Sequence, residues 1–101
     1  NIQDIYDQIV ECIQLADFHD LETRQIIYAY CAYEYSMLLG FLGLLPKKNR
    51  TVYYQRLKSL IWLLSYDLCD KVKKVKKVNI FFGYKILCFT LSLFIKFKNR
   101  W

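Results

Sequence analysis

Between Ile26 and Leu45 the chain carries a single formal charge, that of Glu34. A run of this length could cross a bilayer, because a membrane-spanning helix needs about 20 apolar residues. A glutamate near its centre opposes that interpretation, since insertion would cost at least about 2–3 kcal/mol. Four tyrosines also place hydroxyl groups in the run, where they need hydrogen-bond partners: Tyr28, Tyr30, Tyr33 and Tyr35. We therefore predict a core helix over residues 21–45, covered by its neighbours, with a small integral membrane protein as an alternative.

Apolar residues also recur at helical spacing on either side of this run. The expected helices cover residues 2–18, 21–45, 51–68, 71–77 and 84–97. Asp20, Thr51 and Asp70 are expected to cap the second, third and fourth helices, and Pro46 and Gly83 to separate neighbouring ones. Only three glycines and one proline occur, which argues against a turn-rich β-sandwich. The sequence predicts an all-α fold, a compact bundle of about five helices in one domain, residues 1–101, with the second helix long and largely buried.

The spacing also predicts which side chains the later helices bury. In the third helix the expected apolar face comprises Val52, Tyr53, Leu57, Leu60, Ile61, Leu64 and Leu68. In the fourth it comprises Val72, Val75 and Val78. In the last it comprises Leu87, Leu91, Phe94 and Ile95, widened by Cys88 and Phe89. These faces are expected to pack against the core helix.

Charge is distributed unevenly along the chain. Residues 1–34 contain seven carboxylates and one cation, Arg24, whereas residues 35–101 contain fourteen lysines and arginines and two carboxylates, Asp67 and Asp70. The net charge of +6 therefore hides an acidic first third and a strongly basic remainder. Such asymmetry indicates that the basic part faces an anionic partner, or that the acidic part lies against it.

No residue pattern in the chain predicts catalysis. Nucleotide-binding glycine loops, zinc-protease motifs and serine-hydrolase motifs are missing from the sequence. His19, beside Asp17 and Asp20, is interpreted as part of a capped helix boundary rather than as a general base. The carboxylates of Asp4, Asp7 and Glu11 are interpreted as a solvated helix face rather than a metal site.

The four cysteines show no metal-ligand spacing. They are Cys12, Cys31, Cys69 and Cys88. Each lies in an apolar stretch, and a free cysteine commonly behaves as a small buried hydrophobe. They are therefore expected to be reduced, which is typical of a cytoplasmic protein.

Basic residues next to large apolar ones are the most informative functional feature. Five lysines lie between Lys71 and Lys77, shortly before Phe81 and Phe82, and further cations accompany the aromatic residues of the last helix. This combination is typical of a segment that lies on an anionic membrane face. The residues expected to make this contact are Lys71, Lys73, Lys74, Lys76, Lys77, Lys85, Lys96, Lys98, Arg100 and Trp101. A merely solvated face is the alternative, and nucleic acid is disfavoured because no recognised binding motif occurs and arginine is scarce.

The order of features in the second half has a parallel in a known family. Residues 57–66 read Leu-Lys-Ser-Leu-Ile-Trp-Leu-Leu-Ser-Tyr and precede the lysine and valine segment 71–78. Gly83, Tyr84 and Lys85 follow, and then an apolar helix with a basic end. This order resembles the C-terminal tail of bacterial family-2 glycosyltransferases, which build capsular and other surface polysaccharides. Residues 28–43 would be the long helix after the catalytic domain.

The resemblance implies a non-catalytic accessory domain. The family binds a nucleotide-sugar and a divalent metal through an Asp-x-Asp motif that this chain lacks, so those cofactors would belong to the parent enzyme. The chain begins with Asn1 rather than methionine, and we expect a C-terminal fragment. It would dock on its own catalytic domain or on the inner membrane leaflet, on the cytoplasmic side. A helical module that forms a homodimer is the alternative from another class.

Overall fold

The computed structural model describes residues 2–98. All regular structure in this part of the chain is helical, so the all-α prediction is confirmed. Five α-helices and two short 3-10 segments follow one another. They are α1 (Ile2–Ala16), α2 (Leu21–Phe41), η1 (Leu42–Leu44), α3 (Lys47–Lys58), η2 (Ile61–Ser65), α4 (Asp70–Phe82) and α5 (Tyr84–Lys98).

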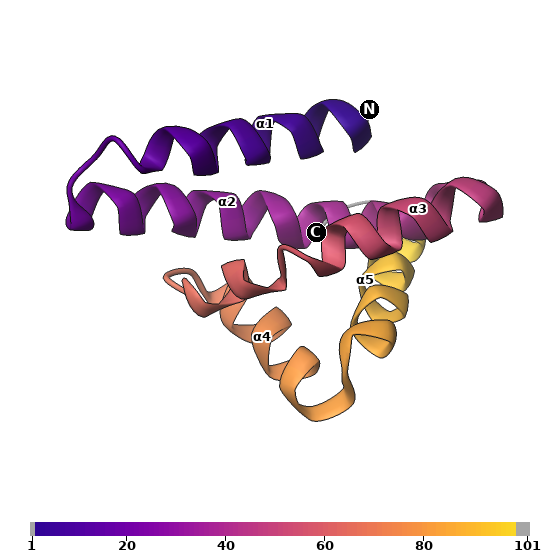
Figure 1. Ribbon diagram of the computed structural model, residues 1–101. Helices are drawn as coiled ribbons and strands as arrows, with labels where there is room; N and C mark the ends of the chain where they lie inside the picture. Colours follow the sequence, from indigo (N-terminus) through magenta and orange to yellow (C-terminus); the bar gives the residue numbers. More distant parts are fainter. Residues whose placement is uncertain (1, 99–101) are drawn as a thin grey trace.

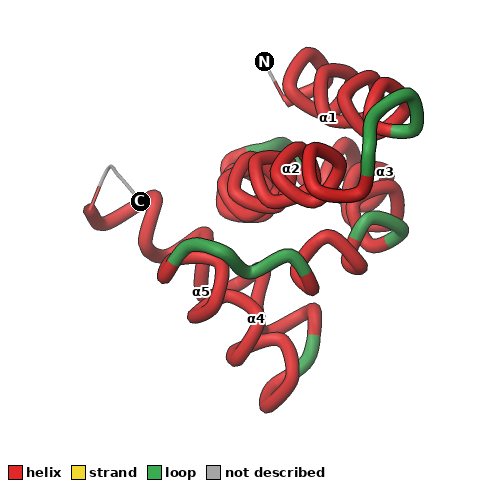
Figure 2. Tube along the Cα trace, turned by 90° about the vertical axis from the view of Figure 1, so that its left-hand side faces the viewer, coloured by secondary structure: helices red, strands yellow, loops and turns green. Residues whose placement is uncertain are grey.

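Helix α2 runs through the middle of the molecule. In Figure 1, α1 lies antiparallel along one side of α2, while α4 and α5 lie on the other side, and Figure 2 shows the same layering from a perpendicular direction. The buried residues of α2 are Cys31, Ala32, Tyr35, Ser36, Leu38, Leu39 and Gly40. The predicted core helix is thus confirmed, with its burial concentrated in its second half, while Leu21 and Ile26 near its start are exposed. Among residues 2–98, no helix combines the length and the apolar character that a bilayer crossing requires.

Two helix boundaries follow directly from local chemistry. Asp20 is the N-cap of α2, and its carboxylate accepts a hydrogen bond of 2.8 Å from the backbone N–H of Thr23. That bond satisfies a donor that the first helical turn leaves without a partner. Gly83 ends α4 at a φ of +89°, a backbone conformation that residues with a side chain rarely adopt. Both predicted boundaries are confirmed.

The predicted start of the third helix is wrong. Thr51 was expected to cap a helix through residue 68, but α3 begins at Lys47, with Pro46 at its N-cap, and ends at Lys58. Proline is compatible with a helix start because the first turn has no internal use for its missing N–H. The residues after Pro46 therefore continue as helix, and Thr51 lies inside it. Beyond Lys58 the chain tightens into η2.

This break also changes the buried face expected for residues 51–68. Leu57 and Leu64 are buried as predicted, but Val52 and Leu68 are exposed. Leu63, outside the predicted face, is fully buried. The helical period no longer relates side chains on the two sides of a break, because the 3-10 segment has a different rise and twist.

The start of α4 lies one position away from its predicted place. Cys69 is the N-cap, and Asp70 is the first helical residue rather than the cap. Its carboxylate still lies in the first turn, where the partial positive charge of the helix end stabilises an anion. The helix runs to Phe82, past the predicted end at residue 77. Val72 and Val75 are buried, which confirms the predicted apolar edge.

The apolar face expected for the last helix is only partly correct. Leu87, Leu91 and Ile95 are buried, but Phe89 and Phe94 are exposed. α5 packs against α2 and η1 on one side and against α4 on another. Phe94 lies at the cleft between α5 and α4, and Phe89 at the hollow between α5 and α3, so neither side chain is covered by a neighbouring helix.

Two tyrosine hydroxyls hold the end of α3 against the rest of the bundle. Tyr35 of α2 donates a hydrogen bond to the backbone carbonyl of Leu57, and both residues are fully buried. Tyr84 of α5 donates to the carbonyl of Tyr54 over 2.9 Å, and the two tyrosine rings lie 4.8 Å apart. The hydroxyls in the apolar interior therefore have partners, as burial of a polar group requires.

Candidate functional site

The lysines of α4 point away from the core that its valines enter. Lys71, Lys73, Lys74 and Lys77 are exposed. Lys76 is half-buried and forms an ion pair of 3.5 Å with Asp67. The carboxylate of Asp67 partly neutralises the charge of Lys76, because opposite charges at this distance attract. Lys76 is therefore less available than an exposed lysine to bind an anionic partner.

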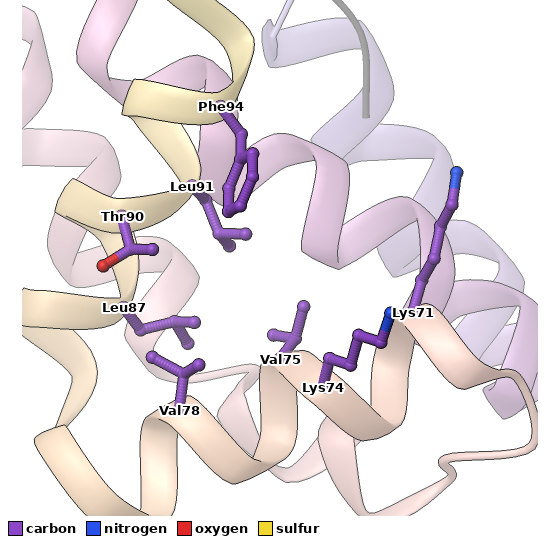
Figure 3. Close-up of a pocket in the computed structure, with 8 residues that line it drawn as sticks. All are labelled: Lys71, Lys74, Val75, Val78, Leu87, Thr90, Leu91 and Phe94. Atoms are coloured by element: carbon purple, nitrogen blue, oxygen red, sulfur yellow. The ribbon is translucent and has the colours of Figure 1, made fainter. Parts of the chain in front are cut away.

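A shallow cleft separates α4 from α5. Val75 and Val78 of α4 face Leu87, Leu91 and Phe94 of α5 across it, as Figure 3 shows. Lys71 and Lys74 stand at one edge of the cleft, which has a volume of about 270 Å³. The cleft offers an apolar floor with cations at its rim.

The turn between α4 and α5 exposes three consecutive large apolar side chains. Ile80, Phe81 and Phe82 have 66%, 75% and 63% of their surface accessible, and Gly83 follows them. In Figure 1 this turn, which we call the hairpin tip, lies at the edge of the molecule opposite α1. Large apolar groups gathered at an exposed turn indicate a contact surface, because isolated exposure is common but clustering is not.

The exposed side of α5 continues this apolar character. Ile86, Phe89, Leu93 and Phe97 recur every three or four residues and are all exposed. At about 100° per residue this spacing places them along one face of the helix. We call this set the outer face of α5. Together with the hairpin tip it forms a surface that residues 2–98 leave uncovered.

Lys85 and Lys96, which were predicted to act with the α4 lysines, lie elsewhere. They line a hollow of about 540 Å³ between α5 and the start of α3, together with Lys47 and Arg50. The residues of α5 that line this hollow and those that line the α4–α5 cleft lie on opposite sides of the helix, at about 100° per residue. The predicted contact residues therefore divide into two groups.

Three predicted contact residues lie wholly or partly outside the described part of the chain. The side chain of Lys98 and the whole of Arg100 and Trp101 lie outside the described part of the chain. Conversely, Lys47 and Arg50 line the hollow between α3 and α5 although they were not among the predicted contact residues. The signal that could have found them is Pro46, because a helix that starts there places both residues in its first turns.

The carboxylates of α1 and the lysines of the α4–α5 hairpin lie at opposite sides of the molecule. Asp4, Asp7 and Glu11 are exposed on α1. The segment from Asp70 to Lys98 carries eight lysines and one carboxylate. Because α1 and the α4–α5 hairpin flank α2 on opposite sides (Figure 1), the molecule has an acidic side and a basic side.

The buried thiols are poor nucleophiles at neutral pH. Burial raises the pKa of Cys31 to about 12 and that of Cys88 to about 11, so both stay protonated. His19 is exposed at the α1–α2 turn, where its carbonyl accepts a hydrogen bond from Arg24. Within residues 2–98, no group of three or more histidine, cysteine, aspartate or glutamate side chains is arranged to hold a metal ion.

A scan against protein-family models, a search of curated proteins and a search of solved structures each found no match. The resemblance to family-2 glycosyltransferases therefore rests on the order of features in the sequence. The geometry of the hairpin tip and of the two groups of cations is the independent basis for a functional proposal.

Proposed function

We propose that the chain is a non-catalytic helical docking module that binds an anionic membrane face through its α4–α5 hairpin. The observation that carries this proposal is the exposure of Ile80, Phe81 and Phe82 at the hairpin tip, at the side of the molecule opposite the acidic α1. The tip would enter the headgroup region, and the lysines of α4 would lie near the anionic lipids.

The energetic terms favour such adsorption. Full burial of a phenylalanine or isoleucine side chain contributes about 1.5–3 kcal/mol relative to exposure in water. Each lysine near an anionic surface adds about 1 kcal/mol. Lys73 and Lys77 are exposed on α4. The tip and these lysines together supply both the apolar and the electrostatic contribution that stable interfacial binding needs.

The distribution of charge would also orient the molecule. A chain with carboxylates on α1 and lysines on α4 and α5 experiences a torque near a negative surface, because one side is repelled and the other attracted. The basic side carries the exposed tip, so the electrostatic orientation presents the apolar side chains to the lipid.

The enzymatic context is a further proposal. It draws on the resemblance of residues 57–66, segment 71–78 and the final helix to the C-terminal tail of family-2 glycosyltransferases. In that context the module would hold the catalytic domain on the cytoplasmic side of the inner membrane, where confinement raises the effective concentration of a surface-anchored acceptor. A nucleotide-sugar-binding domain encoded directly before Asn1 would support this assignment, and an unrelated domain there would remove it.

Vesicle flotation tests the docking proposal. The chain is expected to float with phosphatidylcholine vesicles that contain phosphatidylglycerol, and to stay behind with phosphatidylcholine alone. Replacing Phe81→Ser and Phe82→Ser together is expected to weaken binding by about tenfold or more, because two apolar contributions are lost. High salt should weaken binding as well, since exposed charges are screened.

Phe18→Ser is the matched control for the tip variant. Phe18 is 85% exposed at the α1–α2 turn, so its replacement removes a comparable apolar group from a different part of the molecule. For the charges, Lys73→Gln with Lys77→Gln is compared with Lys48→Gln and Lys58→Gln on α3, which make the same change in net charge. If the control variants lose as much binding as the hairpin variants, the hairpin does not dock the protein.

A second copy of the chain is the other candidate partner. The outer face of α5 favours it, because Phe89 and Leu93 are exposed in the middle of a helix. Sedimentation equilibrium in lipid-free buffer distinguishes the two. A dimer that dissociates on Phe89→Ser and Leu93→Ser would support self-association, and a monomer at all concentrations would exclude it.

A further inference from the structure

The hollow between α3 and α5 is a second candidate binding site, separate from the hairpin tip. The hollow between α3 and α5 is lined by four cationic side chains: Lys47, Arg50, Lys85 and Lys96. Among residues 2–98, no carboxylate lines it. Its volume of about 540 Å³ falls within the range of small-molecule sites, about 300–1,000 Å³. Four like charges around one hollow repel one another, and an anion bound between them would offset this repulsion.

Acidic side chains of the protein do not neutralise this cluster. The salt bridge found within residues 2–98 joins Lys76 to Asp67 on another part of the molecule. Arg50 uses one guanidinium nitrogen to donate a hydrogen bond of 3.1 Å to the carbonyl of Leu45, which orients the group and leaves its other donors to serve a ligand. The cations at the hollow therefore lack an acidic partner in the described chain.

The start of α3 adds further positive character. Pro46 caps this helix without a side-chain hydrogen bond, and the first turns that follow it supply Lys47, Arg50 and Thr51 to the hollow. A helix begins with backbone N–H groups that lack internal partners and with a partial positive charge. Both properties reinforce the attraction that the side chains exert on an anion.

Neutral hydrogen-bond donors line the same hollow. Thr51 and Tyr54 bring hydroxyl groups to it. Burial raises the pKa of Tyr54, so its phenol stays protonated at neutral pH. A ligand with several acceptor oxygens could receive hydrogen bonds from hydroxyl, ammonium and guanidinium groups together.

We infer that this hollow binds a phosphate-bearing ligand, whose phosphate is attracted by the cations that line the hollow, Lys47, Arg50, Lys85 and Lys96. A phosphate monoester or diphosphate matches the site better than a carboxylate, because it carries more negative charge and more acceptor oxygens for cations that come from two helices. The phosphate belongs either to a soluble phosphate ester or to a lipid headgroup. Phe89 and Leu93 line the hollow as well and offer apolar contact to the remainder of either ligand.

Calorimetric titration of the chain with inorganic pyrophosphate in lipid-free buffer tests the site. Saturable binding is expected. Lys85→Gln with Lys96→Gln is expected to weaken it by about tenfold or more, because each charge-assisted contact contributes about 1.5–3 kcal/mol. The matched control is Lys48→Gln with Lys58→Gln on α3, which makes the same change in net charge at exposed residues that do not line the hollow and should leave the affinity unchanged. Circular dichroism checks that both variants retain their helices.

A vesicle experiment distinguishes the two sources of phosphate. Vesicles with phosphatidic acid, a phosphate monoester, are compared with phosphatidylglycerol vesicles of equal surface charge. Preference for phosphatidic acid that disappears in the Lys85 and Lys96 variant supports a lipid headgroup, and pyrophosphate binding without that preference supports a soluble ester. The site is disproved if neither probe binds selectively, or if the α3 control variant loses as much affinity for pyrophosphate as the Lys85 and Lys96 variant does. Docking by the hairpin tip is measured on phosphatidylglycerol with other variants, so either proposal can fail alone.

Discussion

Tyrosines in an apolar run obtain partners in different ways. Tyr35 is fully buried and donates its hydroxyl proton to the carbonyl of Leu57. Tyr28 packs its ring against Trp62, with centroids 5.2 Å apart and planes nearly perpendicular. Tyr30 is exposed, and the neighbouring carboxylate of Glu34 raises its phenol pKa. Similar residues in one helix therefore have different energetic roles, which their positions around the helix decide.

Tyr35→Phe is expected to destabilise the protein by about 1–3 kcal/mol, because it removes a buried hydrogen bond and leaves the Leu57 carbonyl one partner short. The lower part of that range is expected, since this carbonyl also accepts from the N–H of Leu60. Urea unfolding followed by circular dichroism measures the change. Tyr30→Phe, which removes an exposed hydroxyl from the same helix, should shift the midpoint little. Equal shifts for the two variants would contradict the role assigned to Tyr35.

At the scale of elements, two glycines allow the end of α2 and the segment η1 to pack closely against α5. A Cβ atom placed on Gly43 would lie 2.4 Å from the Cβ and Oγ atoms of Ser92. A Cβ atom on Gly40 would lie 2.9 Å from Cγ1 of Ile95. Ser92 is too short to rotate out of the way, whereas the longer Ile95 side chain can adjust. Glycine at position 43 is therefore a condition for the contact between η1 and α5.

Gly43→Ala is expected to destabilise the protein by about 1–3 kcal/mol, the usual cost of overpacking, and to do so more than Gly40→Ala. Urea midpoints of the two variants test the order. Adding Ser92→Gly to Gly43→Ala should recover part of the loss, because it removes the atoms that the new methyl group meets. Simple additivity of the two changes would show that they do not interact and would count against this contact.

At the scale of the whole molecule, buried ionisable groups connect stability to pH. Burial raises the pKa of Cys31 from 9.0 to about 12 and that of Cys88 from 9.0 to about 11. It also raises the pKa of Tyr35 and Tyr84 above their ordinary value. All four groups are neutral in the folded chain over a range in which the unfolded chain has begun to ionise. Their combined effect on stability therefore has one sign.

The free energy of unfolding should be constant from about pH 7 to about pH 8.5 with respect to these groups, and should fall above about pH 9. Over that higher range the unfolded chain releases protons that the folded chain retains, so ionisation favours unfolding. Urea midpoints measured across the range test this. Cys31→Ala should reduce the slope, whereas Cys69→Ala, at an exposed thiol, should not. If Cys31→Ala left the pH dependence of the unfolding free energy unchanged, the contribution assigned to Cys31 would be contradicted.

The candidate site was predictable only in part. The lysines of α4 could be selected from sequence because five of them lie within seven residues. Which of these lysines are available to a partner could not be predicted from sequence. The ion pair between Lys76 and Asp67 depends on the path of the chain between the end of η2 and the start of α4. The basic hollow was not predictable, because Lys47 and Lys96 are far apart in sequence and meet only when α3 packs beside α5.

The sequence alone determined the helical class, the core position of residues 21–45, and the breaks at Asp20 and Gly83. These depend on short-range chemistry: hydrophobic spacing, a capping carboxylate and a backbone angle suited to glycine. Tertiary structure alone decided that one side of α5 stays uncovered and that the cations divide between two parts of the surface. Which surfaces are buried depends on how helices cross, and that is settled by contacts between residues distant in the chain.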